Sequence, residues 1–191
     1  MGTRTVAEFV VELKSITARN TDPAAVIERV IPLAQDLAQD TSWVQPAFYQ
    51  CDEEQGFGIT VLNQEPDDGL FVEVICWLPG RGVAPHDHQT WGVVVGLDGE
   101  EVNVDWRRLD DGSQPGYAEL ETAKETAVTH GAVVSFLPND IHSVRNDGDV
   151  PSLSLHVYGN TLSAMKRSEF DPINKTQKPC PQRKRATIAA E

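Results

Sequence analysis

The sequence predicts a mainly β domain of the sandwich or barrel type, preceded by a helical segment. Residues 1–41 carry apolar side chains at helical spacing. After Ser42, short segments rich in Val, Ile, Phe and Trp alternate with clusters of Gly, Pro, Asp and Asn at intervals of roughly 8 to 12 residues. A chain of 191 residues, 40% hydrophobic and 24% charged, fits one compact domain with its own core.

Two helices are predicted in the N-terminal segment. Apolar residues recur at helical spacing over residues 6–16. Asp22 followed by Pro23 is an N-cap and first-turn pattern, and it opens a second apolar stripe over residues 26–31. We expect Pro32 to kink or end this second helix, because proline removes a backbone donor and its ring clashes with the preceding turn.

Seven strands are predicted after the helices. They cover residues 58–62, 70–78, 91–97, 101–107, 132–137, 142–146 and 152–158. Clusters of turn-forming residues separate these strands. The domain is expected to span residues 1–174, with the barrel and the segment after it over residues 42–174. Residues 175–191 have little apolar periodicity and are predicted to form a basic irregular tail.

The charge of the chain argues against nucleic acid and anionic membranes as partners. The formal net charge is −13 at pH 7, and the tail from Lys175 holds five of the 16 basic residues but one of the 29 acidic ones. The rest of the chain is therefore more acidic still, whereas affinity for polyanions needs clustered Lys and Arg. A small anionic substrate would need a dedicated arginine, whose planar guanidinium holds a carboxylate through two hydrogen bonds.

The sequence favours a cytoplasmic protein. No uncharged apolar run approaches the roughly 20 residues that cross a bilayer, and the charged amphipathic start lacks the apolar core of a signal peptide. The three cysteines are widely spaced and odd in number, so they offer neither a disulfide framework nor a CxxC metal site.

Three histidines predict a metal site. His86 and His88 follow a glycine-bearing turn, and on an extended backbone residues i and i+2 project to the same face, so both can bind one ion. His142 comes later, four residues after Pro138. Neutral imidazoles are the commonest ligands of divalent transition metals. Asp87, between the first two histidines, is expected to point to the opposite face and to cap a turn rather than to bind metal.

These residues resemble the motifs of the cupin superfamily. The first cupin motif, a glycine, five residues and HxH, is matched by residues 80–88, and its closing glycine is matched by Gly99. Gly92 stands where that motif has a glutamate. The end of the second motif is similar to Pro138, His142 and Asn146. The resemblance implies the cupin fold, a double-stranded β-helix barrel with the metal in its mouth, over residues 42–158.

Without the glutamate, the sequence resembles the thiol dioxygenases, the relatives of cysteine dioxygenase. This resemblance implies an Fe(II) site made of His86, His88 and His142. With O2, such a site oxidises a thiol to a sulfinate. Strict alternation along the last predicted strand places three polar side chains on one face: Ser154, His156 and Tyr158. They are similar to the catalytic Ser-His-Tyr relay of that family, and the competing interpretation is a solvated polar face.

The resemblance also bears on the thiol. Animal-type cysteine dioxygenases carry a cysteine near the position of Gly92, crosslinked to the relay tyrosine, and an arginine near Thr60 that binds the substrate carboxylate; neither is present here. The bacterial 3-mercaptopropionate dioxygenases lack the crosslink and carry an arginine nine residues after the tyrosine, which is Arg167 here. This implies 3-mercaptopropionate or a related thiol, cysteine included, bound through Arg167, with Arg81 and Arg145 as other candidates.

Two further function classes remain open from the sequence. One is a cupin enzyme of other chemistry, because three histidines also suit Zn, Ni, Mn or Cu and the fold hosts many reactions. The other is a non-catalytic cupin that binds a metal or a small ligand, although such a module has no need of polar residues like those at 152–158. A Ser-His hydrolase is weakly supported, since Ser154 and His156 are strand neighbours without a GxSxG elbow.

Overall fold

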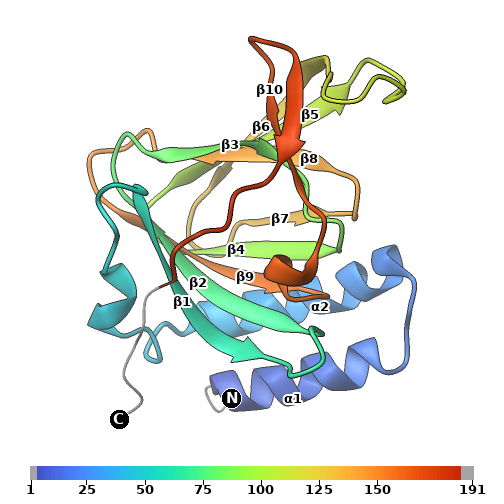
Figure 1. The fold of residues 1–191 in the computed structure, drawn as a ribbon. Helices are drawn as coiled ribbons and strands as arrows, with labels where there is room; N and C mark the ends of the chain where they lie inside the picture. The colour runs from blue at the N-terminus through green and yellow to red at the C-terminus, as the bar shows by residue number, and fades with distance from the viewer. Residues whose placement is uncertain (1–3, 186–191) are drawn as a thin grey trace.

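The computed structural model describes residues 4–185, which form two N-terminal helices and two antiparallel β-sheets (Figure 1). The predicted fold class, a mainly β barrel after a helical segment, is confirmed. The strands are β1 (Phe57–Gln64), β2 (Phe71–Trp77), β3 (Gly82–His86), β4 (Gly92–Asp98), β5 (Glu101–Arg108), β6 (Leu120–Val128), β7 (Val133–Phe136), β8 (Ile141–Arg145), β9 (Ser152–Tyr158), β10 (Ser168–Asp171) and β11 (Thr176–Pro179). The five-stranded sheet has the order β1-β2-β9-β4-β7, and the six-stranded sheet has the order β11-β10-β3-β8-β5-β6.

The helices α1 (Val6–Thr17) and α2 (Pro23–Gln39) begin at the expected caps. The side chain of Asp22 accepts a hydrogen bond from the backbone of Ala25 at the start of α2. Pro32 does not end this helix. Its ring lies on the exposed side, and the next turns bury apolar residues that offset the lost hydrogen bond. Within residues 4–185, neither helix is long and apolar enough to cross a membrane.

The two faces of the five-stranded sheet have different surroundings. One face packs against α1 and α2, which lie beneath it in Figure 1, and forms the main core with residues such as Val74, Val95 and Leu155. The opposite face looks into the barrel, where residues such as Glu73 and His156 line a cavity. Because side chains alternate along a strand, β2 and β9 each supply both the core and the cavity wall.

The register of the strands brings the histidines together. In the six-stranded sheet, β8 pairs with β3 so that His142 lies directly opposite His86. In the other sheet, β9 lies between β2 and β4, and His156 pairs with Glu73 on one side and Val94 on the other. The predicted ligands and the predicted relay therefore come from different sheets and meet inside the barrel.

Each of the seven predicted strands overlaps an observed one, but four strands were not predicted: β3, β6, β10 and β11. Strand β6 is mostly exposed and ends the order of its sheet, so its side chains show little apolar alternation. The prediction of an irregular tail is wrong for Thr176–Pro179, because β11 forms a hairpin with β10. Residues 186–191 of the predicted tail lie outside the described residues.

Candidate metal centre

Three histidines converge inside the barrel. His86 ends β3, His88 follows two residues later, and His142 lies on β8. One ring nitrogen from each lies within 4.8 Å of the other two, and the Nε2 atoms of His88 and His142 are 2.9 Å apart. All three side chains are buried. Three converging imidazoles form the donor set of a divalent transition metal, so this cluster is a candidate metal site.

The cluster is electrically neutral. Burial is the largest cause that lowers the pKa of His86 to about 3, and the charge of nearby Arg167 lowers it further. The pKa values of His88 and His142 are also held well below the usual range, by burial and then by the neighbouring imidazoles. Neutral imidazole is the form that binds a metal, so all three rings are in the binding form at neutral pH.

Neighbouring groups orient two of the rings. The Nδ1 of His142 lies 2.7 Å from Oδ1 of Asn103 on β5, and the Nδ1 of His86 lies 2.9 Å from the carbonyl oxygen of Ala84. Each of these Nδ1 atoms donates to an oxygen, which leaves Nε2 free to bind an ion. Among the described residues, the buried Nδ1 of His88 has no hydrogen-bond partner. The donor set therefore fits a bound metal ion.

Asn103 was not singled out from the sequence, although a signal for it exists. It lies two residues after Glu101 and two before Asp105, so three polar side chains alternate along one predicted strand. Such alternation indicates one polar face. Which element faces that side chain depends on the pairing of β5 with β8, which local patterns do not reveal.

The polar residues of β9 form a continuous hydrogen-bonded run. The hydroxyl of Ser154 lies 2.9 Å from Nε2 of His156, and Nδ1 of His156 lies 2.9 Å from the hydroxyl of Tyr158. All seven residues of β9 are buried, so this strand has no solvated face. The Tyr158 ring lies beside His88, with 4.8 Å between the ring centroids. The run thus ends next to the histidine cluster.

A cavity of about 90 Å³ opens onto the cluster. Its wall includes the three histidines, Tyr158, His156, Glu73 and Arg167. A cavity of this size suits a ligand of few heavy atoms, well below the size of an ordinary drug or dinucleotide site.

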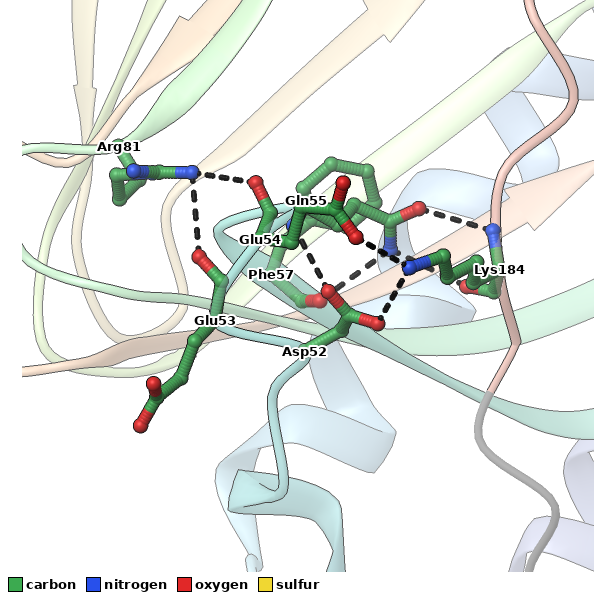
Figure 2. A network of polar contacts seen from close by, with 7 residues as sticks. All are labelled: Asp52, Glu53, Glu54, Gln55, Phe57, Arg81 and Lys184. Atoms are coloured by element: carbon green, nitrogen blue, oxygen red, sulfur yellow. Dashed lines mark hydrogen bonds and ion pairs between the residues drawn. The ribbon is translucent and has the colours of Figure 1, made fainter.

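Of the three arginines considered from the sequence, Arg167 lines the cavity. Its Nε donates to the carbonyl oxygen of Asp87 at 3.3 Å and its Nη2 lies 3.0 Å from Sγ of Cys180, and among the described residues no carboxylate pairs with it. Arg81 instead donates to the backbone carbonyls of Glu53 and Glu54 (Figure 2). Arg145 pairs with the exposed Glu125 and Asp147.

Comparison with known proteins decides the family. The chain matches the family described as cysteine dioxygenase type I over residues 1–171. It belongs to the cysteine dioxygenase type I family. Because this is a family of dioxygenases, the chain falls in a class of enzymes whose reactants are a small molecule and O2.

Solved structures similar to this family member include three proteins of low sequence identity. A conserved protein from Klebsiella pneumoniae with a double-stranded β-helix domain shares 16% identity and a TM-score of 0.44, over 60% of this chain and 85% of that one. Oxalate oxidase in complex with glycolate shares 16% identity and a TM-score of 0.46, over 59% of this chain and 55% of its own. The protein TT1209 from Thermus thermophilus shares 21% identity and a TM-score of 0.44, over 60% of this chain and 91% of its own.

In this cysteine dioxygenase family member, Gly92 lies against Tyr158. The two residues pair directly between β4 and β9, and a Cβ atom at Gly92 would lie 3.0 Å from Cδ1 and Cε1 of Tyr158. A side chain here would push the Tyr158 ring, so glycine permits the close packing of β4 on β9. Cys76 lies in the core on the helical side of the sheet, and Cys180 lies beside Arg167.

Residues 180–185, here called the strap, add a wall that the sequence did not predict. The strap follows β11 and runs across the barrel toward the turn before β1 (Figure 1). Its Cys180, Pro181, Gln182, Arg183 and Arg185 line the cavity. The predicted irregular tail thus contributes to the candidate site.

Lys184 fastens the strap to the acidic turn before β1 (Figure 2). Its Nζ lies 3.1 Å from Asp52 and 2.9 Å from Glu54, and its backbone N–H donates to the side chain of Gln55 at 2.9 Å. Farther back, Arg183 pairs with Glu169 on β10 at 2.9 Å. The complementary charges of the two segments were visible in the sequence, but nothing local linked them.

Reversing the charge of Lys184 is expected to loosen the strap. The ion pairs of Lys184 are exposed and therefore weak, so Lys184→Glu should raise the KM for the substrate by only about two- to fivefold. Oxygen-uptake kinetics measure the KM, and trypsin cleavage after Arg183 measures strap release. Lys175→Glu is the matched control, because it disrupts another exposed ion pair, the one between Lys175 in the β10–β11 turn and Glu119 just before β6. An unchanged KM together with unchanged cleavage would contradict the anchoring role.

Proposed function

We propose that this protein is an Fe(II)-dependent thiol dioxygenase that converts a small mercapto-acid to its sulfinate, with both atoms of O2 transferred to sulfur. The observation that carries the proposal is a set of three neutral histidines on a small cavity that also holds Tyr158 and Arg167. Within residues 4–185, no carboxylate joins the histidine cluster and none pairs with Arg167. The mercapto-acid is 3-mercaptopropionate or a related thiol such as cysteine.

The metal would be held by His86, His88 and His142. Bound Fe(II) would supply the redox chemistry with O2 and favour loss of the thiol proton. The protein contributes the orientation of the rings, through Asn103 and Ala84, and burial that keeps the imidazoles neutral. Both the ring orientation and the burial are present before a substrate enters, so the site is organised in advance.

Arg167 would bind the carboxylate of the substrate. Its guanidinium lines the cavity and is held by one backbone carbonyl and one sulfur atom, so donors remain for a ligand. Glu73 faces the same cavity, and burial raises its pKa to about 7 against the opposing charges of Arg185 and Arg167. An ionised Glu73 would attract the ammonium group of cysteine, so cysteine remains a candidate substrate beside 3-mercaptopropionate.

Tyr158 and His156 would orient the reactants. The Tyr158 hydroxyl is fixed by His156 at the cavity wall, beside the ring of His88. A hydroxyl held there can hydrogen-bond O2 or the substrate next to the histidine cluster. The strap and the barrel walls shield the reactants from bulk water.

The test is oxygen uptake by iron-loaded protein with 3-mercaptopropionate, cysteine and cysteamine, with the sulfinate identified by mass spectrometry. We expect uptake with the two acids and poor uptake with cysteamine, which has no carboxylate. Protein that retains iron but consumes no oxygen with any thiol would contradict the proposal and favour a non-catalytic metal-binding cupin. His142→Ala is the control, because oxygen uptake that persists in this variant does not come from the histidine cluster.

Tyr158→Phe is expected to retain iron and to lower kcat by about 10- to 100-fold. The substitution deletes one hydroxyl beside the cluster without touching a predicted ligand, and losses of this kind are typical of groups around a metal site. Metal analysis and steady-state oxygen uptake measure the two effects separately. Wild-type turnover in this variant would mean that the β9 hydrogen bonds serve the fold alone.

A further inference from the structure

Glu101 extends the hydrogen-bonded run of β9 by one residue. It begins β5 and is 2% exposed. The hydroxyl of Ser154 donates to Oε2 of Glu101 at 2.8 Å. The chain of contacts therefore runs from Glu101 through Ser154 and His156 to Tyr158, and it connects a buried carboxyl group to the cavity wall.

Few other groups face Glu101. The Trp77 indole on β2 is near, but among the described residues neither its Nε1 nor Oε1 of Glu101 has a hydrogen-bond partner. No Lys or Arg of residues 4–185 pairs with Glu101. His156 is neutral, because burial lowers its pKa to about 3. The carboxyl group is thus buried without a compensating positive charge.

The ionised form of Glu101 fixes the direction of every hydrogen bond in the chain. A carboxylate only accepts, so the Ser154 hydroxyl must donate to it, and the Ser154 oxygen accepts from Nε2–H of His156. Nδ1 of His156 then carries no proton and accepts from Tyr158. In this state the Tyr158 proton points away from the cavity, and the phenol oxygen presents only lone pairs to a ligand.

The protonated form of Glu101 permits the reverse direction. The carboxyl group then donates to Ser154, and Ser154 donates to Nε2 of His156. Nδ1–H of His156 donates to the Tyr158 oxygen. The Tyr158 hydroxyl is now free to donate into the cavity, and the heavy atoms need not move.

We propose that Glu101 is a positioning residue, which sets whether Tyr158 offers a hydrogen-bond donor or an acceptor to the ligand at the histidine cluster. Desolvation, opposed by the weaker effects of the Ser154 hydroxyl and then of the Trp77 indole, raises the pKa of Glu101 to about 7. Both directions of the chain are therefore populated near neutral pH. The direction is a property of the protein itself, and only its use in catalysis rests on the proposed function.

The tautomer of His156 tests the direction of the chain. The full-length protein, labelled with ¹⁵N-histidine and loaded with diamagnetic Zn(II), is examined by NMR from pH 5.5 to 8.5. For a group with a pKa near 7, the ratio of protonated to ionised Glu101 changes from about ten at pH 6 to about one tenth at pH 8. We expect His156 to change from mainly Nδ1–H to mainly Nε2–H over this range. The His156 signal is assigned by its loss in His156→Gln.

Three variants separate Glu101 from other causes. Glu101→Gln cannot ionise, and Ser154→Ala interrupts the chain, so both should make the His156 tautomer independent of pH. Glu73→Gln removes the other buried carboxyl group with a pKa near 7, directly across from His156 on β2, and should preserve the transition. A tautomer that is constant with pH in the wild type, or a transition that survives in Glu101→Gln and Ser154→Ala, would overturn the proposal.

Kinetics extend the test to the iron enzyme. The ratio of wild-type to Glu101→Gln kcat should change with pH around 7, whereas KM should change little, because Glu101 does not line the cavity. A pH-dependent His156 tautomer without turnover of any thiol would contradict the proposed function, but it would support the role of Glu101 in setting the direction of the hydrogen bonds. Turnover with a constant kcat ratio and a constant tautomer would contradict the role of Glu101 and leave the proposed function intact.

Discussion

Alanine at His86 or His142 is expected to reduce bound iron from about one ion per chain to a small fraction of that value. Two imidazoles would remain, and Gly92 stands at the position where many cupins supply a carboxylate, so that position cannot supply a replacement ligand. Metal analysis of anaerobically purified protein measures the occupancy. Full occupancy in either variant would rule out this cluster as the iron site.

His130→Ala is the matched control for these variants. His130 is exposed, and its Nδ1 lies 2.9 Å from the carbonyl oxygen of Leu97, away from the cluster. Its loss removes an imidazole without changing the site, so iron binding should equal that of the wild type. Circular dichroism of each variant shows whether lost iron reflects a lost ligand or a lost fold.

Removal of the Arg167 guanidinium is expected to change substrate selectivity. A hydrogen bond to a charged group is worth about 1.5–3 kcal/mol, so Arg167→Ala should lower kcat/KM for 3-mercaptopropionate by at least about tenfold. Cysteamine lacks the carboxylate, and its kcat/KM should hardly change. Arg167→Lys keeps the charge but loses the planar fork, so its effect should be intermediate.

The comparison of substrates within one variant decides the role of Arg167. Equal losses for the acid and for cysteamine would mean that the arginine supports the wall, for example through its contact with Cys180 of the strap. Arg145→Ala removes a guanidinium that pairs with Glu125 and Asp147 outside the cavity, and it should leave the kcat/KM of both thiols unchanged.

Local patterns were sufficient for the parts of the site that lie on single strands. The alternation of Ser154, His156 and Tyr158 is a property of one extended segment, and the observed hydrogen bonds follow from it. The HxH spacing also brings His86, the last residue of β3, close to His88, two residues beyond the strand. Joining them to His142 needed the resemblance to a barrel family, because the pairing of β3 with β8 links residues more than fifty positions apart.

Groups that contact the site residues from another strand or segment could not be predicted from local sequence patterns. Glu101 and Asn103 are ordinary polar residues of a strand until β5 is placed beside β8 and opposite β9. The strap is held by charges rather than by apolar periodicity, so its sequence predicts no structure. In both cases the information lies in contacts between distant segments.

The backbone pairing of His86 with His142 has a practical consequence for preparing the protein. Two of the three imidazoles are joined by the hydrogen-bonded ladder of β3 and β8, so the strands keep them near each other whatever the ion. We therefore expect that the fold does not depend on a bound metal ion in the way that a small zinc finger depends on zinc. Chelation followed by loading with Co(II) or Cu(II) should then give a folded protein, in which the visible absorption and magnetic resonance of the ion report on the geometry of the three nitrogen donors.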